Sequence, residues 1–257
     1  MKEQFSIKLF CIPHAGGSAL AYHRWKSSLS KGIQLIPLEL AGRGKRIELQ
    51  LYENFEQAIH DIYCLLLDSI DENPYVLLGH SMGGLLAYEI VQKLIAKNKK
   101  LPIHLVVSGC LAPQKQMMVD SLSDKPLDIL KEYILSLGGT PIEIFEDPTL
   151  RRIMLPIIRS DYQMMENYEF FTGFYLLPCD ISIFTGKSDP ITLGKGLGWD
   201  EICSGSVNYY QFSGGHFFIY DPANHITSRM DFKLTKEQEQ YRMEIQNFAR
   251  TNLNNIV

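Results

Sequence analysis

The sequence predicts an α/β fold in which a mostly parallel central sheet is flanked by helices. Short apolar runs alternate along the chain with longer amphipathic segments. Alternation of this kind is typical of a parallel sheet with helical crossovers. Several of the runs are apolar almost throughout, as strands must be when helices cover both faces of the sheet.

Six segments have the length and composition of strands: Ile7–Ile12, Ile33–Leu40, Tyr75–Gly79, Ile103–Ser108, Asp180–Thr185 and Val207–Phe212. Helical patterns lie between and after them, at about Tyr22–Leu29, Phe55–Ser69, Met82–Lys97 and Thr235–Asn252. The apolar residues of the second helical pattern recur at the spacing of one helix face, which predicts a helix packed on the sheet.

The alternation of strands and helices is interrupted between Leu111 and Leu177. This stretch has helical patterns at Leu127–Leu137 and Thr149–Tyr168 and is rich in Met and aromatic residues, MMVD at residues 117–120 included. Such side chains form adaptable apolar walls. We therefore expect a helical lid insertion at about residues 112–177, within one domain that spans residues 1–257. Ordinary packing of extra helices on the core is the alternative.

Composition and charge narrow the class of protein. The chain has 257 residues and a net charge of −4, so no basic footprint favours nucleic acid. It contains no run of about 18 apolar residues, and its first residues lead directly into a strand, so we expect neither a membrane span nor a signal peptide. Five widely spaced cysteines without a CxxC pair suit a reducing cytoplasm better than a disulfide framework or a zinc site.

The strongest chemical signal is the segment YVLLGHSMGG, which contains Gly79-x-Ser81-x-Gly83. An apolar strand precedes it and a helical pattern follows it, which is the context that a nucleophile elbow requires. In this arrangement the helix N-terminus points at the serine, where its partial positive charge favours a developing oxyanion. We predict that Ser81 is a nucleophile; a glycine-rich turn with a capping serine is the alternative.

A nucleophilic serine needs a base, and this arrangement orders its triad as serine, acid, histidine. His216 follows a strand and a Gly-Gly pair, whereas His225 lies in a polar turn and His104 opens a strand. We therefore predict His216 as the base.

The acid should lie just beyond a strand between the serine and the base. Asp189 meets this condition in the segment ISIFTGKSDP, and we predict it as the acid. Asp180 begins its strand, at the opposite end of the sheet. Asp200 is a weaker rival, and Asp161 falls in the lid pattern.

The second oxyanion donor of such a site comes from a loop after an early strand. The first strand ends in CIPHAGGSA, and we predict the backbone amide of Ala15 as this donor, paired with that of Met82 beside the nucleophile. The loop lacks both GxGxxG and GxxxxGK[ST], so a phosphate-binding role is not supported.

Taken together, these segments resemble the type II thioesterases, the stand-alone editing thioesterases of polyketide and nonribosomal peptide synthesis. The resemblance rests on PHAGGSA, LAGRGKR, GHSMGG, FTGKSDP and GGHFF in this order, and on the lid segment PIEIFEDPTLRRIMLPIIRSDYQMMENY. It implies an α/β-hydrolase fold with a helical lid, a triad of Ser81, Asp189 and His216, and oxyanion donors at Ala15 and Met82.

The resemblance also implies that the chain hydrolyses acyl thioesters on the phosphopantetheine arm of acyl or peptidyl carrier proteins. Thioesters are activated acyl donors, so we expect no metal or organic cofactor. Arg151, Arg152 and Lys195 are candidate contacts for an acidic carrier protein. A small-molecule carboxylesterase or lipase, an acyltransferase or product-releasing thioesterase, and a non-catalytic binding protein are the alternatives. The oligomeric state is not predicted.

Overall fold

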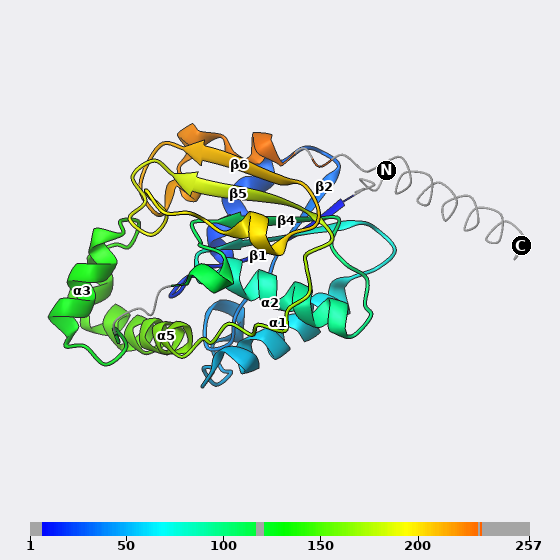
Figure 1. Cartoon of the computed structure of the whole chain (residues 1–257). Helices are drawn as coiled ribbons and strands as arrows, with labels where there is room; N and C mark the ends of the chain where they lie inside the picture. The colour runs from blue at the N-terminus through cyan, green and yellow to red at the C-terminus, as the bar shows by residue number, and fades with distance from the viewer. Residues whose placement is uncertain (1–6, 117–120, 231, 233–257) are drawn as a thin grey trace, which may run out of the picture.

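The computed structural model describes residues 7–116, 121–230 and 232, and it contains a six-stranded, wholly parallel sheet (Figure 1). The strands lie in the order β2-β1-β3-β4-β5-β6. Their bounds are Ile7–Ile12 (β1), Ile33–Pro37 (β2), Tyr75–His80 (β3), His104–Ser108 (β4), Asp180–Gly186 (β5) and Val207–Phe212 (β6). The predicted fold class is confirmed.

Strand β2 is shorter than predicted, because it ends at Pro37 rather than at Leu40. Among the described residues it is an edge strand that pairs with β1 alone, and β1 ends at Ile12. Pro13, which follows β1, has no amide proton, so it cannot donate the next hydrogen bond of the β1–β2 ladder. The last hydrogen bond between β2 and β1 runs from the Leu38 amide to the carbonyl oxygen of Cys11.

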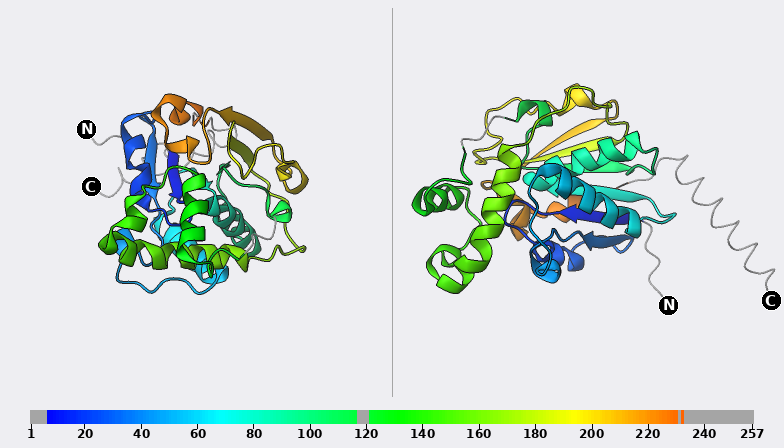
Figure 2. Two further views of the ribbon diagram at one scale, coloured as in Figure 1. Left: turned by 90° about the vertical axis from the view of Figure 1, so that its left-hand side faces the viewer. Right: turned by 90° about the horizontal axis from the view of Figure 1, so that it is seen from below.

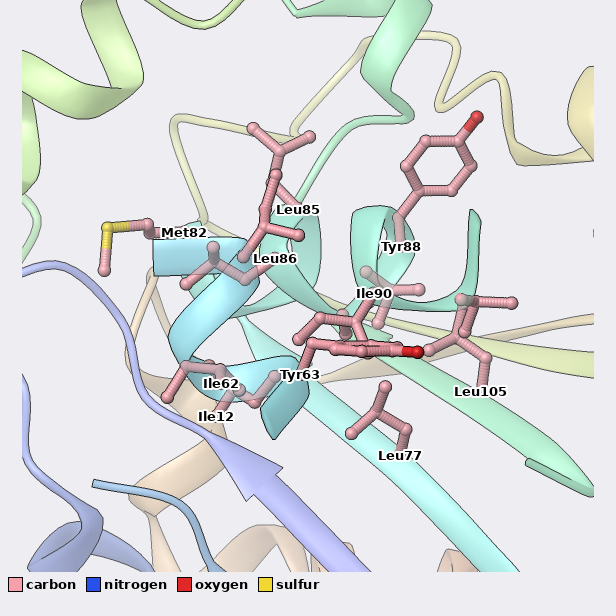
Figure 3. Packing of buried hydrophobic residues seen from close by; sticks show 14 of the residues in the cluster. Ile12, Ile62, Tyr63, Leu77, Met82, Leu85, Leu86, Tyr88, Ile90 and Leu105 are labelled. Atoms are coloured by element: carbon pink, nitrogen blue, oxygen red, sulfur yellow. The ribbon is translucent and has the colours of Figure 1, made fainter. Parts of the chain in front are cut away.

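Helices α1 (Phe55–Ser69) and α2 (Met82–Ala96) pack on the same face of the sheet (Figure 1). The Asn54 side chain caps α1 by accepting a bond from the Gln57 amide, and the predicted apolar stripe of α1 is buried. Figure 3 shows Ile62 and Tyr63 of α1 meeting side chains of α2 and of the sheet. This cluster forms the larger part of the core.

The opposite face of the sheet is covered by 3₁₀ segments, among them η1 (Ala19–Ser27), η5 (Phe218–Tyr220) and η7 (Ile226–Arg229). Because strand residues alternate between the faces, Leu9 packs here while Phe10 belongs to the core on the helical face. The helix predicted at Tyr22–Leu29 is thus a 3₁₀ helix that begins earlier, where Ser18 caps it. The helix predicted at Thr235–Asn252 lies outside the described residues.

The segment between β4 and β5 is helical, with a short 3₁₀ turn η3 (Pro113–Lys115) followed by α3 (Leu127–Ser136), α4 (Glu143–Glu146) and α5 (Pro148–Glu166). Figures 1 and 2 show α3 and α5 at the end of the sheet toward which the strands point. They share a small apolar cluster of their own with Leu122. The predicted helices of this segment are confirmed; residues 117–120, the MMVD of the sequence, lie outside the described residues.

The strand order changes direction at β1, since β2 lies on one side of it and β3 on the other. In open parallel sheets, ligands bind at the carboxyl ends of the strands beside such a switch point. We therefore expect a binding site at the loops that follow β1 and β3. Among the described residues, no helix is long and apolar enough to span a membrane.

The packing of Leu77 gives a test of this core. Leu77 of β3 is fully buried between the sheet and α1 and α2, so Leu77→Ala should lower the free energy of unfolding by about 2–5 kcal/mol. Leu20→Ala is the matched control, because Leu20 is 68% exposed and its loss should change that free energy by at most about 0.5 kcal/mol. Urea unfolding followed by circular dichroism measures both; equal effects would contradict the assigned core.

Candidate active site

Ser81 lies in a sharp turn between β3 and α2, with φ 55° and ψ −121°. A positive φ is costly for any residue with a Cβ, so the surrounding contacts must hold the turn. The Ser81 amide donates to the carbonyl oxygen of Ser108 on β4 at 2.7 Å, and the Ser81 carbonyl accepts from the amide of Gly84 at 2.8 Å. The side chain is half-buried at the carboxyl end of the sheet.

The two flanking glycines are required by space. A Cβ at Gly83 would overlap the carbonyl oxygen of Ile12 and would lie 2.6 Å from that of Pro13. A Cβ at Gly79 would overlap the carbonyl group of Gly83 and lie 2.5 Å from the amide nitrogen of Gly84. All of these obstacles are backbone atoms, which cannot rotate away. The predicted elbow geometry is therefore present, with strand, turn and helix packed backbone to backbone.

Asp189 and His216 lie on the loops after β5 and β6, and the Asp189 Oδ1 and His216 Nδ1 atoms are 3.0 Å apart. Both side chains are buried. The two loops are joined by a bond from the Ser188 amide to the Gly214 carbonyl oxygen at 2.9 Å. A carboxylate opposite Nδ1 makes that nitrogen the protonated one, which leaves Nε2 as the proton acceptor of a neutral ring.

Asp189 is held in its ionised form by three donors. Burial raises the pKa of Asp189, but the hydrogen bond and charge of His216 and the bonds from the Ile191 amide and the Thr192 hydroxyl outweigh it, so the pKa lies below its usual value. Asp189 was predicted from the sequence and Thr192 was not, although a hydroxyl three residues after an aspartate in a turn is a common partner for its carboxylate. Asp200, the weaker rival, is exposed and accepts a bond from Tyr209 instead.

Two further histidines surround this pair. The rings of His80 and His216 lie 5.0 Å apart, and those of His80 and His14 lie 5.8 Å apart. Desolvation, followed by the electrostatic influence of His216 and Arg43, lowers the pKa of His14 to about 3. Desolvation and the other two histidines lower the pKa of His80 well below its usual value. Both rings are therefore neutral near pH 7. No local pattern in the sequence predicts this cluster.

The amides of Ala15 and Met82 lie on the two loops beside the switch point, after β1 and after β3 respectively. Neither amide donates a hydrogen bond to another of the described residues. The Met82 amide is at the first position of α2, where helix amides have no partner within the helix. Both amides are thus available to an anionic oxygen.

A cavity of about 120 Å³ adjoins Ala15, whereas Ser81, Met82, Asp189 and His216 are not among the residues that line it. Its walls come from the loop after β1, from α3 and α5, and from Phe217 next to His216; they include Ala15, Gly16, Ile134, Leu137, Ile158 and Tyr162. A larger cavity of about 330 Å³ lies between α1, α2 and residues 171–175, and none of the candidate site residues lines it.

Other candidate groups do not come together with Ser81. The Nε2 atom of His104 lies 2.8 Å from the hydroxyl of Ser182, but this pair lies at the start of β4 and within β5. Since His104 is four residues before Ser108, it is about 13 Å along the strand from the edge where Ser81 lies. Within the described ranges, no group of three or more His, Cys, Asp or Glu side chains is arranged to hold a metal ion.

Comparison with known proteins places this site in a family. Residues 7–234 match the family described as "Thioesterase domain". The chain is 31% identical over 216 residues to the gramicidin S biosynthesis protein GrsT of Aneurinibacillus migulanus, which covers 84% of each protein.

Two solved structures are similar in both sequence and fold. ClbQ from the colibactin NRPS/PKS pathway has a TM-score of 0.82 and 32% identity, covering 93% of this chain and 99% of that one. The type II thioesterase BorB from the borrelidin biosynthetic cluster has a TM-score of 0.78 and 30% identity, covering 88% of this chain and 91% of that one. The predicted resemblance to type II thioesterases is confirmed, and the chain belongs to the thioesterase domain family of hydrolases.

Proposed function

We propose that this thioesterase removes acyl groups from the phosphopantetheine arm of acyl or peptidyl carrier proteins, as a type II, editing enzyme of nonribosomal peptide or polyketide synthesis. The observation that carries the proposal is the strained Ser81 turn beside the buried His216–Asp189 hydrogen bond. The origin of ClbQ and BorB in biosynthetic clusters supports the carrier-bound substrate. Five unpaired cysteines suit the reducing cytoplasm in which such synthases work.

In this mechanism Ser81 attacks the thioester carbonyl while Nε2 of His216 takes the hydroxyl proton. The tetrahedral oxyanion accepts hydrogen bonds from the amides of Ala15 and Met82. The C–S bond then breaks, the departing sulfur takes the proton from His216 and leaves as a thiol, and Ser81 carries the acyl group as an ester while His216 is neutral again. A water molecule, deprotonated by His216, attacks that ester, and the carboxylic acid departs as the Ser81 hydroxyl is restored. Asp189 keeps the imidazole in the required tautomer throughout.

We further propose that α3, α4 and α5 form a lid, at about residues 112–177 of a single domain, and that the 120 Å³ cavity beneath them receives the acyl group. The cavity is small beside ligand pockets of about 300–1,000 Å³, which favours short acyl groups in this arrangement of the lid. Arg152 and Lys195 are exposed, and with Arg151 they stay the candidate contacts for an acidic carrier protein.

Substitution of Ser81 tests the nucleophile. Ser81→Ala should abolish acyl release, since it removes the attacking oxygen and leaves the fold unchanged. Ser81→Gly should be equally inactive and at least as stable as Ser81→Ala, because glycine adopts a φ near +55° without a Cβ penalty. Turnover of an acyl-pantetheine and thermal melting give the two readouts. Retained turnover in either variant would sink the assignment of Ser81.

Substitution of Asp189 tests the acid. Asp189→Asn should lower kcat by about 10⁴-fold, as loss of the carboxylate permits the wrong imidazole tautomer. Asp200→Asn is the matched control and should leave kcat unchanged, because Asp200 contacts Tyr209 on the surface. Steady-state kinetics on one acyl-pantetheine compares the two. If Asp200→Asn were the crippling change, the acid would have been assigned to the wrong residue.

The carrier dependence tests the substrate class. The wild-type enzyme should strip acetyl and longer acyl groups from a phosphopantetheinylated carrier protein with a higher kcat/KM than from the matched acyl-pantetheine, because the carrier adds contact surface. Loss of the acyl mass from the carrier is followed by mass spectrometry, with Ser81→Ala as the blank. Cleavage of simple esters with loaded carriers left intact would identify a small-molecule esterase instead. Transfer of the acyl group to an added amine or alcohol would identify an acyltransferase.

A further inference from the structure

A buried ion pair joins α5 to the loop that carries Ala15. Arg43, in the loop after β2, and Asp161 of α5 form two parallel bonds, with Nη1–Oδ2 at 2.6 Å and Nη2–Oδ1 at 2.7 Å. Their side chains are 3% and 0% exposed. The mechanism above uses neither residue.

Both members of the pair also bind the backbone of the Ala15 loop. Asp161 Oδ2 accepts a hydrogen bond from the Gly16 amide at 2.7 Å, and Arg43 Nη1 donates to the Gly17 carbonyl oxygen at 3.2 Å. The Arg43 Nε atom donates to the carbonyl oxygen of Ala41 at 3.3 Å, which ties the guanidinium to its own loop. The pair therefore holds the Ala15–Gly16 peptide through its N–H group and the Gly17–Ser18 peptide through its carbonyl group.

These bonds fix the conformation of a tight turn. The Gly17 amide donates to the His14 carbonyl oxygen at 2.9 Å, and Gly16 has a φ of +75°, so His14 to Gly17 form a type II β-turn with glycine at its third position. Type I and type II turns differ by a flip of the central peptide, which in this turn is the Ala15–Gly16 peptide. Because Asp161 accepts a hydrogen bond from the Gly16 amide, it favours the type II orientation of that peptide.

The direction of the Ala15 amide follows from this turn. A trans peptide is planar, so the Ala15 N–H points away from the His14 carbonyl oxygen that the turn binds. The same loop packs directly on α5, because a Cβ on Gly16 would lie 2.9 Å from Cγ1 of Ile158. Helix α5 thus supports the turn through both a charged contact and an apolar one.

We propose that Arg43 and Asp161 are a positioning pair for the oxyanion hole, which makes α5 part of the catalytic scaffold as well as part of the lid. This inference rests on the proposed function, in which the Ala15 amide is an oxyanion donor. Stability alone does not account for the pair, since replacing a buried ion pair by well-packed apolar residues is often neutral or stabilising. What an apolar pair could not provide is the Asp161 carboxylate oxygen that accepts the hydrogen bond from the Gly16 amide.

The test separates folding from catalysis with the double variant Arg43→Met/Asp161→Leu. It should fold, and its kcat should fall at least about tenfold, toward the 100- to 1,000-fold typical of a lost oxyanion donor. The KM for an acyl-pantetheine should change little. The affinity for an acyl trifluoromethyl ketone, whose Ser81 adduct carries an oxyanion, should fall by a factor similar to that in kcat.

The matched control is Arg46→Met/Asp61→Leu. Arg46, three residues after Arg43, and Asp61 of α1 also form two parallel bonds, both at 2.7 Å. This pair is less buried, with side chains 20% and 28% exposed, and its bonds do not reach residues 14–17. This variant should keep the wild-type kcat and ketone affinity.

A second variant, Asp161→Glu, keeps the charge but displaces the carboxylate, and it should also lose kcat and ketone affinity. It decides the question if the double variant fails to fold. Folded variants at Arg43 and Asp161 with wild-type kcat and ketone affinity would overturn the inference and leave the pair a structural role. Failure of the proposed function is distinguishable, because the wild-type enzyme would then leave loaded carriers intact, transfer the acyl group to an added acceptor or turn over without Ser81, whereas failure of this inference changes none of these results.

Discussion

The close approach of the Ser81 turn to strand β1 is the constraint on which the rest of the structure depends. Gly83 can lie against the carbonyl groups of Ile12 and Pro13 only because it has no side chain. A residue held at a φ of 55° costs on the order of 1–3 kcal/mol, and such a conformation persists where its surroundings over-determine it. Here the surroundings are the bond to Ser108, the start of α2 and the backbone of β1. The proposed nucleophile is thus fixed by contacts from β1 and β4, the strands on either side of β3, and by the start of α2.

The sheet order then explains how distant parts of the sequence meet at that turn. With β1 and β3 adjacent, the loops that follow them lie side by side and contribute Ala15 and Met82. With β5 and β6 adjacent on the other side of β4, their loops contribute Asp189 and His216, and a backbone bond between Ser188 and Gly214 holds those loops together. All of these loops leave from the carboxyl ends of parallel strands, so one edge of the sheet collects every group of the proposed site.

The features that the sequence predicted are those written in local patterns. The wholly apolar strands, the stripe of α1 and the Gly-x-Ser-x-Gly elbow each lie within a few residues, and short-range periodicity or steric need is enough to identify them. The remaining features depend on contacts between distant residues. Asp161 could be read only as part of a helical pattern, because its partner Arg43 is 118 residues away. The same is true of His14 and His80, whose neutrality follows from packing beside His216. The helix expected at Tyr22–Leu29 is a 3₁₀ segment that starts earlier, at Ala19, where Ser18 caps it and its Tyr22 and Trp25 pack on the sheet.

The distribution of charge around Ser81 determines which groups can stabilise the oxyanion. The positive charge of Arg43 is balanced by the negative charge of Asp161, and His14 and His80 are neutral near pH 7. The ionised Asp189 has as its counterpart the proton that His216 gains during the reaction. No unpaired cation among these groups is left to stabilise the oxyanion, so that task falls to the backbone amides. An amide dipole acts only over a short distance and in one direction, which makes its placement decisive. The Arg43–Asp161 pair therefore acts by holding the turn at Ala15 in position, and its own charges do not stabilise the oxyanion.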